Sequence, residues 1–109
     1  MATNQSLGEF EHIVLLTLIR LGEDAYGMSV RATIHELIKR DISIGAIYTT
    51  LERLQNKGYV KSRMGEATAK RGGRAKKYFS VTGKGRKAVQ NARNNLEALW
   101  QGIQIQQPA

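Results

Sequence analysis

The stretch SIGAIYTTLERLQNKGYV, residues 43–60, decides the fold. Ser43 offers a hydroxyl that can cap a helix over residues 44–57, and Gly58 stands where that helix would end. Three large apolar residues share one face of this helix: Ile47, Leu51 and Leu54. The pattern predicts a short helix that buries one side and exposes the other.

The opposite face of this helix is small near its start and can form hydrogen bonds along its length. It holds Gly45, Thr49, Glu52, Arg53 and Asn56. A helix that reads base edges in the DNA major groove needs close approach at its N-terminal end and hydrogen-bonding side chains beyond it. In isolation the same face is equally compatible with an ordinary solvated helix, so its neighbours in the chain must decide.

A second helix is expected just before this one, over residues 26–40. Its apolar residues lie on or near one stripe: Met28, Val30, Ile34, Leu37 and Ile38. Only a tight connection at Asp41 and Ile42 separates it from Ser43. Two short helices joined by so brief a turn indicate a helix-turn-helix.

After Gly58 the apolar pattern changes from helical to alternating. Val60, Ser62 and Met64 are expected on one side of a strand and Tyr59, Lys61 and Arg63 on the other. A second run, residues 76–81, turns Phe79 and Val81 inward, and the glycine-rich stretch 65–75 lies between the two runs. The fold class that follows is mainly α with a small β-hairpin, that is, a winged helix-turn-helix.

Two flanking helices indicate a second subunit. Residues 7–21 are apolar around nearly the whole helix and must be covered on more than one side.

Thr82 can cap a last helix to about Gln104, although Gly83 and Gly85 weaken its first turn. Heptad spacing on that helix predicts a homodimer. The expected interface is Phe10, Val14, Val89, Ala92, Leu96, Leu99, Trp100 and Ile103. The DNA-binding domain is then 7–81, and the dimerisation helix 82–105.

Positive charge is concentrated in the second half of the chain. The 109 residues carry 17 Lys and Arg against 9 Asp and Glu, a formal charge of +8, and the stretch from Lys61 to Lys87 holds a single acid, Glu66. Such an excess favours a polyanion as partner. The hairpin cations expected to follow the DNA backbone or enter the minor groove are Lys70, Arg71, Arg74, Lys76 and Lys77.

The sequence gives little support to an enzymatic, metal-binding or cofactor-binding function. His12 and His35 have no partner at metal-ligand spacing, and no nucleophile–His–acid grouping, phosphate loop or paired carboxylate is apparent. We therefore expect no enzyme, no cofactor and no metal. The absence of cysteine, of a signal-peptide pattern and of a membrane-span pattern predicts a cytoplasmic location. The rival hypothesis is a winged-helix module that binds RNA or a protein complex.

GAIYTTLERL (45–54) followed by KGYV (57–60) resembles the core motif of the PadR family of bacterial transcription regulators. Supporting pieces are Ala25-Tyr26-Gly27 and the stretch 74–85. Thr49 stands where proline is usual in the family, and Ala46 where threonine is. The resemblance implies a homodimeric repressor on an inverted-repeat operator, of the short subfamily with one C-terminal dimerisation helix. The DNA-binding positions expected at the third helix are Ser43, Gly45, Ala46, Tyr48, Thr49 and Arg53.

The resemblance leaves two side chains with alternative roles. Tyr48 either reaches a phosphate with its hydroxyl while its ring packs on the domain, or simply packs under the hairpin. Trp100 is either an anchor of the dimer interface or, with Leu96, part of a ligand site. In drug-responsive members of the subfamily, a tryptophan on the paired C-terminal helices stacks on flat aromatic compounds. A flat aromatic small molecule is therefore a candidate partner beside DNA.

Overall fold

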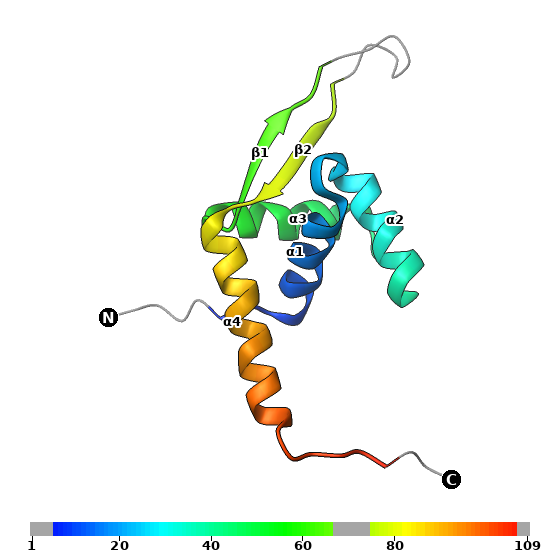
Figure 1. Ribbon diagram of the computed structural model, residues 1–109. Coiled ribbons are helices and arrows are strands. Elements are labelled where there is room, and N and C mark those ends of the chain that lie inside the picture. Colours follow the sequence, from blue (N-terminus) through cyan, green and yellow to red (C-terminus); the bar gives the residue numbers. More distant parts are fainter. Residues whose placement is uncertain (1–5, 67–74, 107–109) are drawn as a thin grey trace.

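The computed structural model describes residues 6–66 and 75–106 and has the predicted winged helix-turn-helix architecture (Figure 1). Three helices precede an antiparallel hairpin, and a longer helix follows it. The elements are α1 (Glu9–Leu21), the 3₁₀ turn η1 (Gly22–Asp24), α2 (Gly27–Ile38), α3 (Ile44–Asn56), β1 (Val60–Met64), β2 (Lys77–Val81) and α4 (Gly83–Trp100). Within these ranges, no helix is long and apolar enough to cross a bilayer.

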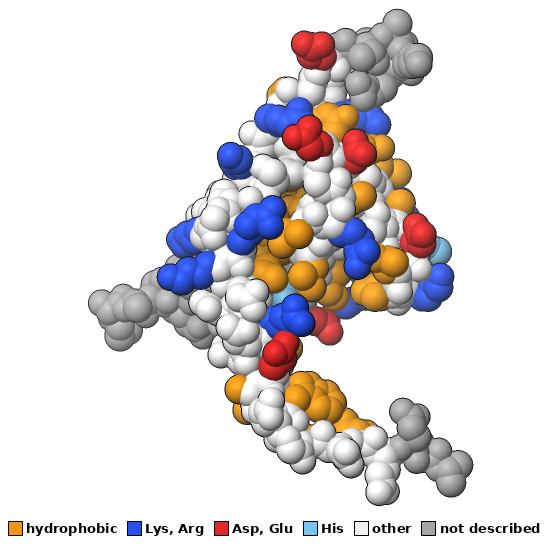
Figure 2. Space-filling model, in the orientation of Figure 1, with side chains coloured by type: hydrophobic (Ala, Val, Ile, Leu, Met, Phe, Trp, Pro, Cys, Tyr) orange, Lys and Arg blue, Asp and Glu red, His pale blue; other side chains and the backbone are white. Residues whose placement is uncertain are grey.

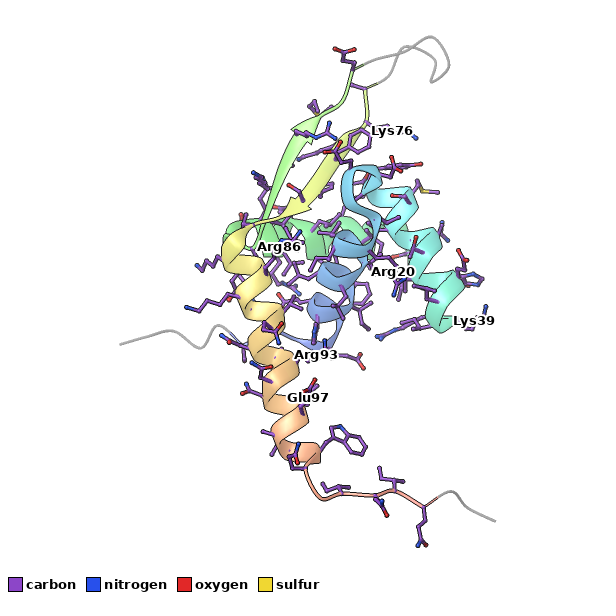
Figure 3. The ribbon with its side chains drawn as sticks, viewed as in Figure 1. Arg20, Lys39, Lys76, Arg86, Arg93 and Glu97 are labelled. Atoms are coloured by element: carbon purple, nitrogen blue, oxygen red, sulfur yellow. The ribbon has the colours of Figure 1, made fainter. Side chains whose placement is uncertain are left out.

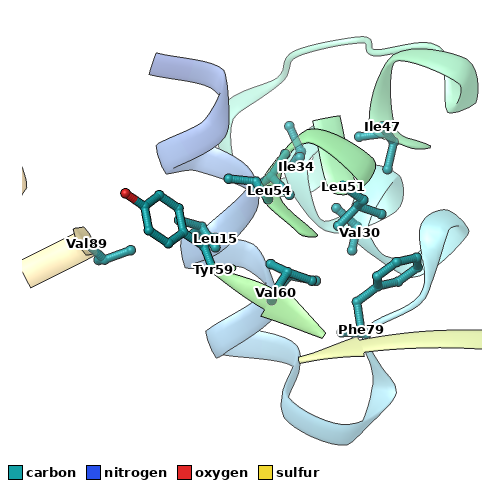
Figure 4. Packing of buried hydrophobic residues seen from close by; sticks show 13 residues of the cluster. Leu15, Val30, Ile34, Ile47, Leu51, Leu54, Tyr59, Val60, Phe79 and Val89 are labelled. Carbon is teal, nitrogen blue, oxygen red and sulfur yellow. The ribbon is translucent and has the colours of Figure 1, made fainter. Parts of the chain in front are cut away.

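The core lies around α1, which packs against α2, α3, β2 and α4 (Figure 4). Its fully buried side chains come from the first three helices and the hairpin. They include Val14, Leu15 and Leu18 of α1, Val30 and Ile34 of α2, Ile47, Leu51 and Leu54 of α3, and Val60 and Phe79 of the hairpin. The predicted apolar stripe of α2 is therefore only partly internal, because Met28, Leu37 and Ile38 are exposed.

Residues in the left-handed region end two of the helices. Gly58, at φ +82°, follows the last turn of α3, and Lys39, at φ +57°, follows α2. The helix α2 ends at Ile38, two residues before the predicted limit at Arg40, and the Lys39 amide donates to the His35 carbonyl. The chain then crosses from α2 to α3 in five residues, where Arg31 Nε donates to the Ile42 carbonyl at 2.8 Å. These bonds hold the two helices of the motif at one angle.

The hairpin pairs in the register Val60↔Val81, Ser62↔Phe79 and Met64↔Lys77. Tyr59 does not follow the predicted alternation, because it is buried like its neighbour Val60. It precedes β1 and belongs to the turn that ends α3, where its amide donates to the Leu54 carbonyl at 2.9 Å. Its ring lies beside Leu15 and Val89, which joins the hairpin, α1 and α4 (Figure 4).

The helix α4 begins where predicted but ends four residues before Gln104. Thr82 caps it by accepting from the Gly85 amide at 3.0 Å. Gly85 is required here, because a Cβ would collide with the Tyr59 carbonyl oxygen. The helix stops at Trp100, and Gly102 then adopts φ +76°. The predicted extension to Gln104 is wrong, since glycine has little helix propensity and terminates the α-helix here, leaving Ile103 outside the heptad pattern.

One partly buried ion pair ties the start of α1 to the end of α3. Lys57 Nζ donates to the two Glu11 carboxylate oxygens at 3.0 and 2.9 Å, and the Gly8 amide donates to Glu11 Oε1 at 2.8 Å. Burial alone would raise the pKa of Glu11. The hydrogen bonds from Gly8 and Lys57, with the charges of Lys57 and Arg53, outweigh burial and hold this pKa below its usual value.

Replacing Glu11 by Gln should lower the free energy of unfolding by about 2 kcal/mol near pH 7, the scale of hydrogen bonds to a charged group. Because the folded-state pKa is lowered, the contribution of Glu11 is present above its usual pKa of 4.5 and is lost as the pH falls below that value. Urea denaturation at fixed protein concentration measures both effects. The control Glu9→Gln removes an exposed partner of Arg40 and should change stability little. A Glu11→Gln deficit that did not shrink in acid would contradict the assignment.

Candidate nucleic-acid interface

The exposed face of α3 is the centre of the candidate interface. Its inner face buries Ile47, Thr50, Leu51 and Leu54 against the core, which turns the remaining side chains to solvent. The exposed residues include all six predicted positions: Ser43, Gly45, Ala46, Tyr48, Thr49 and Arg53. Ser43 caps the helix, with its hydroxyl accepting from the Ala46 amide at 3.1 Å. The end that would approach bases first thus carries only small residues.

Gly45 has no structural reason to be glycine. A Cβ at this position would meet no other atom of the chain within 4 Å. Glycine inside a helix costs roughly 0.5–1 kcal/mol relative to alanine. The missing side chain leaves the backbone of the first turn of α3 open to close approach by another molecule.

Gly27, in contrast, makes room for the Tyr48 ring in its present position. A Cβ on Gly27 would lie 2.5 Å from Cζ and from the hydroxyl oxygen of Tyr48. The Tyr48 ring therefore rests on the first turn of α2, with its centroid 6.3 Å from that of Phe79 in β2. It packs on the domain and still exposes 43% of its surface. Both predicted roles of Tyr48 require its ring to pack on the domain, and the ring does so. Its hydroxyl lies at the N-terminal end of α2.

Aromatic rings anchor the hairpin to the helix-turn-helix. The Phe79 amide donates to the Ala25 carbonyl at 2.8 Å, and the Tyr26 and Tyr78 rings meet edge to face at 5.6 Å. Lys76 Nζ lies 3.9 Å from the Tyr26 ring centroid, and Figure 3 shows this side chain beside the start of α2. The position of the hairpin relative to α3 is therefore fixed by its contacts with the start of α2, in addition to the hydrogen bonds between its two strands.

Two of the five predicted hairpin cations are in the described part of the chain. Lys77 is exposed and Lys76 is half-buried. Neither forms an ion pair with an acid within the described ranges. The other three, Lys70, Arg71 and Arg74, lie outside the described residues.

A hollow of about 680 Å³ separates the hairpin from α2 and α3. It brings the predicted residues Tyr48, Lys76 and Lys77 together with four that the sequence did not indicate: Tyr26, Met28, Met64 and Ala75. Met28 is on the predicted apolar stripe of its helix, but it is exposed. Its position in the first turn of α2, next to Gly27, was the only sequence signal for a place at the surface.

The predicted dimer residues fall into three groups by burial. Val14 has no exposed surface and Val89 almost none, so both belong to the core of the single chain. They offer little surface to a partner. The heptad and stripe patterns do not distinguish a subunit core from a subunit boundary. Phe10 is half-buried beneath the Arg40 guanidinium, and Ala92 is half-buried. The remaining four are exposed: Leu96, Leu99, Trp100 and Ile103.

No cluster of three or more His, Cys, Asp or Glu side chains suited to a metal occurs within residues 6–66 and 75–106. The chemistry available at the described surface is hydrogen bonding from α3, cationic contact from the hairpin, and apolar contact from the end of α4.

Solved structures of transcriptional regulators share this architecture. One from Clostridium thermocellum is 26% identical, with a TM-score of 0.69 over 84% of this chain and 85% of that one. A PadR-like transcriptional regulator from Bacillus cereus is 21% identical, with a TM-score of 0.64 over 86% of this chain and 93% of that one. Bacillus subtilis PadR, solved in complex with operator DNA, is 19% identical, with a TM-score of 0.65 over 91% of this chain and 51% of that one.

No curated protein sequence matches the chain. The sequence profile of the transcriptional regulator PadR-like family matches residues 15–91, from the middle of α1 into α4. This match covers the helix-turn-helix, the hairpin and the start of the last helix, and the protein belongs to the PadR-like family of transcriptional regulators.

Proposed function

We propose that this protein binds double-stranded DNA as a homodimer and represses transcription from an inverted-repeat operator. The observation that carries the proposal is the exposed, small and hydrogen-bonding face of α3 beside a cationic hairpin. An α-helix fits the major groove, where each base pair presents a distinct pattern of donors and acceptors. A regulator of this kind acts where the chromosome is, and the location proposed for it is the cytoplasm.

Each part of the interface has a separate task. Gly45 and Ala46 let the start of α3 approach the base edges, and Thr49 and Arg53 read them. Ser43 and the Tyr48 hydroxyl donate to phosphate oxygens, which sets the position of the helix without reading sequence. The hairpin lysines and arginines, Lys70, Arg71, Arg74, Lys76 and Lys77, contact the flanking backbone or the minor groove.

The end of α4 supports the homodimer. Leu96, Leu99 and Trp100 are large, apolar and exposed on the second half of α4, which projects away from the body of the chain (Figure 1). A groove of about 720 Å³ runs between α1 and α4, and it includes Ile13, Leu16 and Leu96 in its walls. A second α4 seated in this groove would bury both surfaces. The unit 7–81 then binds DNA, and the segment 82–105 joins the subunits.

A gel-shift series tests the proposal against the RNA-binding alternative. Duplexes selected from a random pool should bind more tightly than random duplex or structured RNA at equal salt. Replacing Arg53 by Ala should cost about 1–3 kcal/mol at particular base pairs. Replacing Arg71 and Arg74 by Ala should weaken binding to all duplexes and reduce the salt slope by about one unit per lost phosphate contact.

The matched control is Arg93→Ala, which removes a cation from α4 that is paired with Glu97 and lies far from α3 (Figure 3). It should leave discrimination between duplexes unchanged. Equal or tighter binding of structured RNA would favour the alternative function. An Arg53 variant that lost the same affinity on every duplex would remove Arg53 from the base-reading set.

Replacing Gly45 by Ala separates folding from binding. The new methyl meets open space within the chain, so the free energy of unfolding should rise by about 0.5 kcal/mol. Operator affinity should fall about tenfold, because overpacking a closely fitted contact costs about 1–3 kcal/mol. Gly83→Ala is the control, since its Cβ also meets nothing and it lies at the start of α4. An alanine at 45 that left operator affinity intact would show that DNA does not approach α3 there.

A flat aromatic ligand is a second, dependent proposal. Trp100 is the only tryptophan of the sequence, and it is exposed one helical turn after Leu96. An indole face attracts flat, cationic compounds by stacking and cation–π contact. We expect a planar cationic dye to quench Trp100 fluorescence at micromolar concentration, and the variant Leu96→Asn to weaken that binding. Absence of quenching by several such dyes would leave Trp100 with the role of an interface anchor. Quenching with unchanged operator affinity would mean that ligand binding does not relieve repression.

A further inference from the structure

A second apolar groove lies on the other side of α1, between α1 and α2. We call it the α1–α2 groove. Its volume is about 610 Å³, and its walls are Ile13, Leu16, Thr17, Ile19, Arg20, Ile34, Leu37 and Ile38. Leu37 and Ile38 are 52% and 50% exposed, and apolar side chains are visible over α1 and α2 in the space-filling view (Figure 2). A group of exposed apolar side chains such as this one marks a surface that contacts another molecule.

The α1–α2 groove is continuous with the groove between α1 and α4. Ile13 and Leu16 line both, so these two side chains form a ridge with a hollow on either side. The ridge between the two grooves is apolar, because it consists of these two aliphatic side chains. The proposed dimer interface therefore extends onto the α1–α2 groove.

The segment after α4 has the matching shape and chemistry. Residues 101–106 are not helical, and all of them are exposed. Ile103 and Ile105 are 55% and 71% exposed. In an extended chain, residues two apart point to the same side, so the two isoleucines form one apolar edge and Gln104 and Gln106 the polar one. Residues 101 and 102 form a turn, and the four residues from Ile103 to Gln106 span roughly 13 Å when extended.

We propose that residues 101–106 of one subunit lie in the α1–α2 groove of the other, with Ile103 and Ile105 inserted against Leu16, Leu37 and Ile38. The inference rests on the proposed homodimer and adds a second contact to it. The partner's segment is favoured over the chain's own because α4 departs from the body it belongs to. Val89 is in the core, whereas every described residue after Ala92 is exposed (Figure 1).

This placement gives the C-terminal segment a direct influence on DNA binding. The α1–α2 groove is built partly from α2, and α2 is tied to α3 through the Arg31–Ile42 hydrogen bond and the short connection between the helices. A segment that packs on α2 from the partner subunit therefore helps to set the orientation of each recognition helix relative to the other subunit.

Site-directed cross-linking tests the placement, because the sequence has no cysteine of its own. Chains carrying Ile105→Cys are mixed with size-tagged chains carrying Leu37→Cys and treated with a short bis-maleimide. We expect a covalent heterodimer on a denaturing gel. The control partner carries Ala32→Cys, an exposed position of α2 that does not line the groove. Its yield of heterodimer should be at least tenfold lower.

Equal yields with Leu37→Cys and Ala32→Cys would overturn the inference. A chain carrying both Ile105→Cys and Leu37→Cys that closed on itself, rather than joining a second chain, would overturn it as well. Sedimentation of the unmodified protein shows whether a homodimer forms, so it tests the proposed homodimer separately from the placement of the segment. A monomer would refute both proposals, whereas a dimer without selective cross-linking would refute only the placement of the segment.

An affinity measurement gives a second readout without cross-linking. The pair Ile103→Asp and Ile105→Asp should raise the dimer dissociation constant at least tenfold, because it places two charges in an apolar groove. The pair Gln104→Asp and Gln106→Asp adds the same charge on the opposite edge and should change the constant much less. Equal effects of the two pairs would contradict insertion of the isoleucines.

Discussion

The burial of one face of α3 against α1 is the constraint on which the rest of the structure depends. Ile47, Leu51 and Leu54 have no exposed surface, and they meet Leu15 and Leu18 at the centre of the molecule. Because a helix can bury only one side here, this contact decides which residues of α3 remain free for another molecule. The apolar stripe thus determines the candidate interface indirectly, by fixing the rotation of the helix about its own axis.

Two glycines transmit this arrangement to the rest of the chain by allowing close approach. Gly27 makes room for the Tyr48 ring, so that α2, α3 and the hairpin meet around one aromatic group. Gly85 makes room for the Tyr59 carbonyl, so that α4 starts directly against the end of α3. A methyl group at Gly85 would collide with backbone and force α4 away from the end of α3, whereas one at Gly27 would displace the Tyr48 ring. The distance between α3 and the hairpin is therefore set by packing around the aromatic rings as well as by the strand pairing.

The surface divides into regions with different physical character. The face of α3 and the hairpin is polar and cationic, and it suits a polyanion. The sides of α1, the outer part of α2 and the second half of α4 are apolar and suit a second copy of the chain. The two regions share α2, whose first turn lies under the hairpin and whose last turn lines the α1–α2 groove. A change in subunit packing therefore has a short structural path to the recognition helix.

The sequence by itself determined the element order, the helix-turn-helix, the hairpin and the family, because these follow from local periodicity, capping residues and a short motif. It could not distinguish Val14 and Val89, which are buried within the subunit, from Leu96 and Leu99, which are exposed, since all four fit a helical apolar pattern. It also put Met28 on the apolar stripe of α2, although Met28 is exposed, and carried α4 past Gly102. Only the tertiary structure decided these points, because burial depends on what lies opposite a residue in space, and a periodic pattern records only which residues share a face.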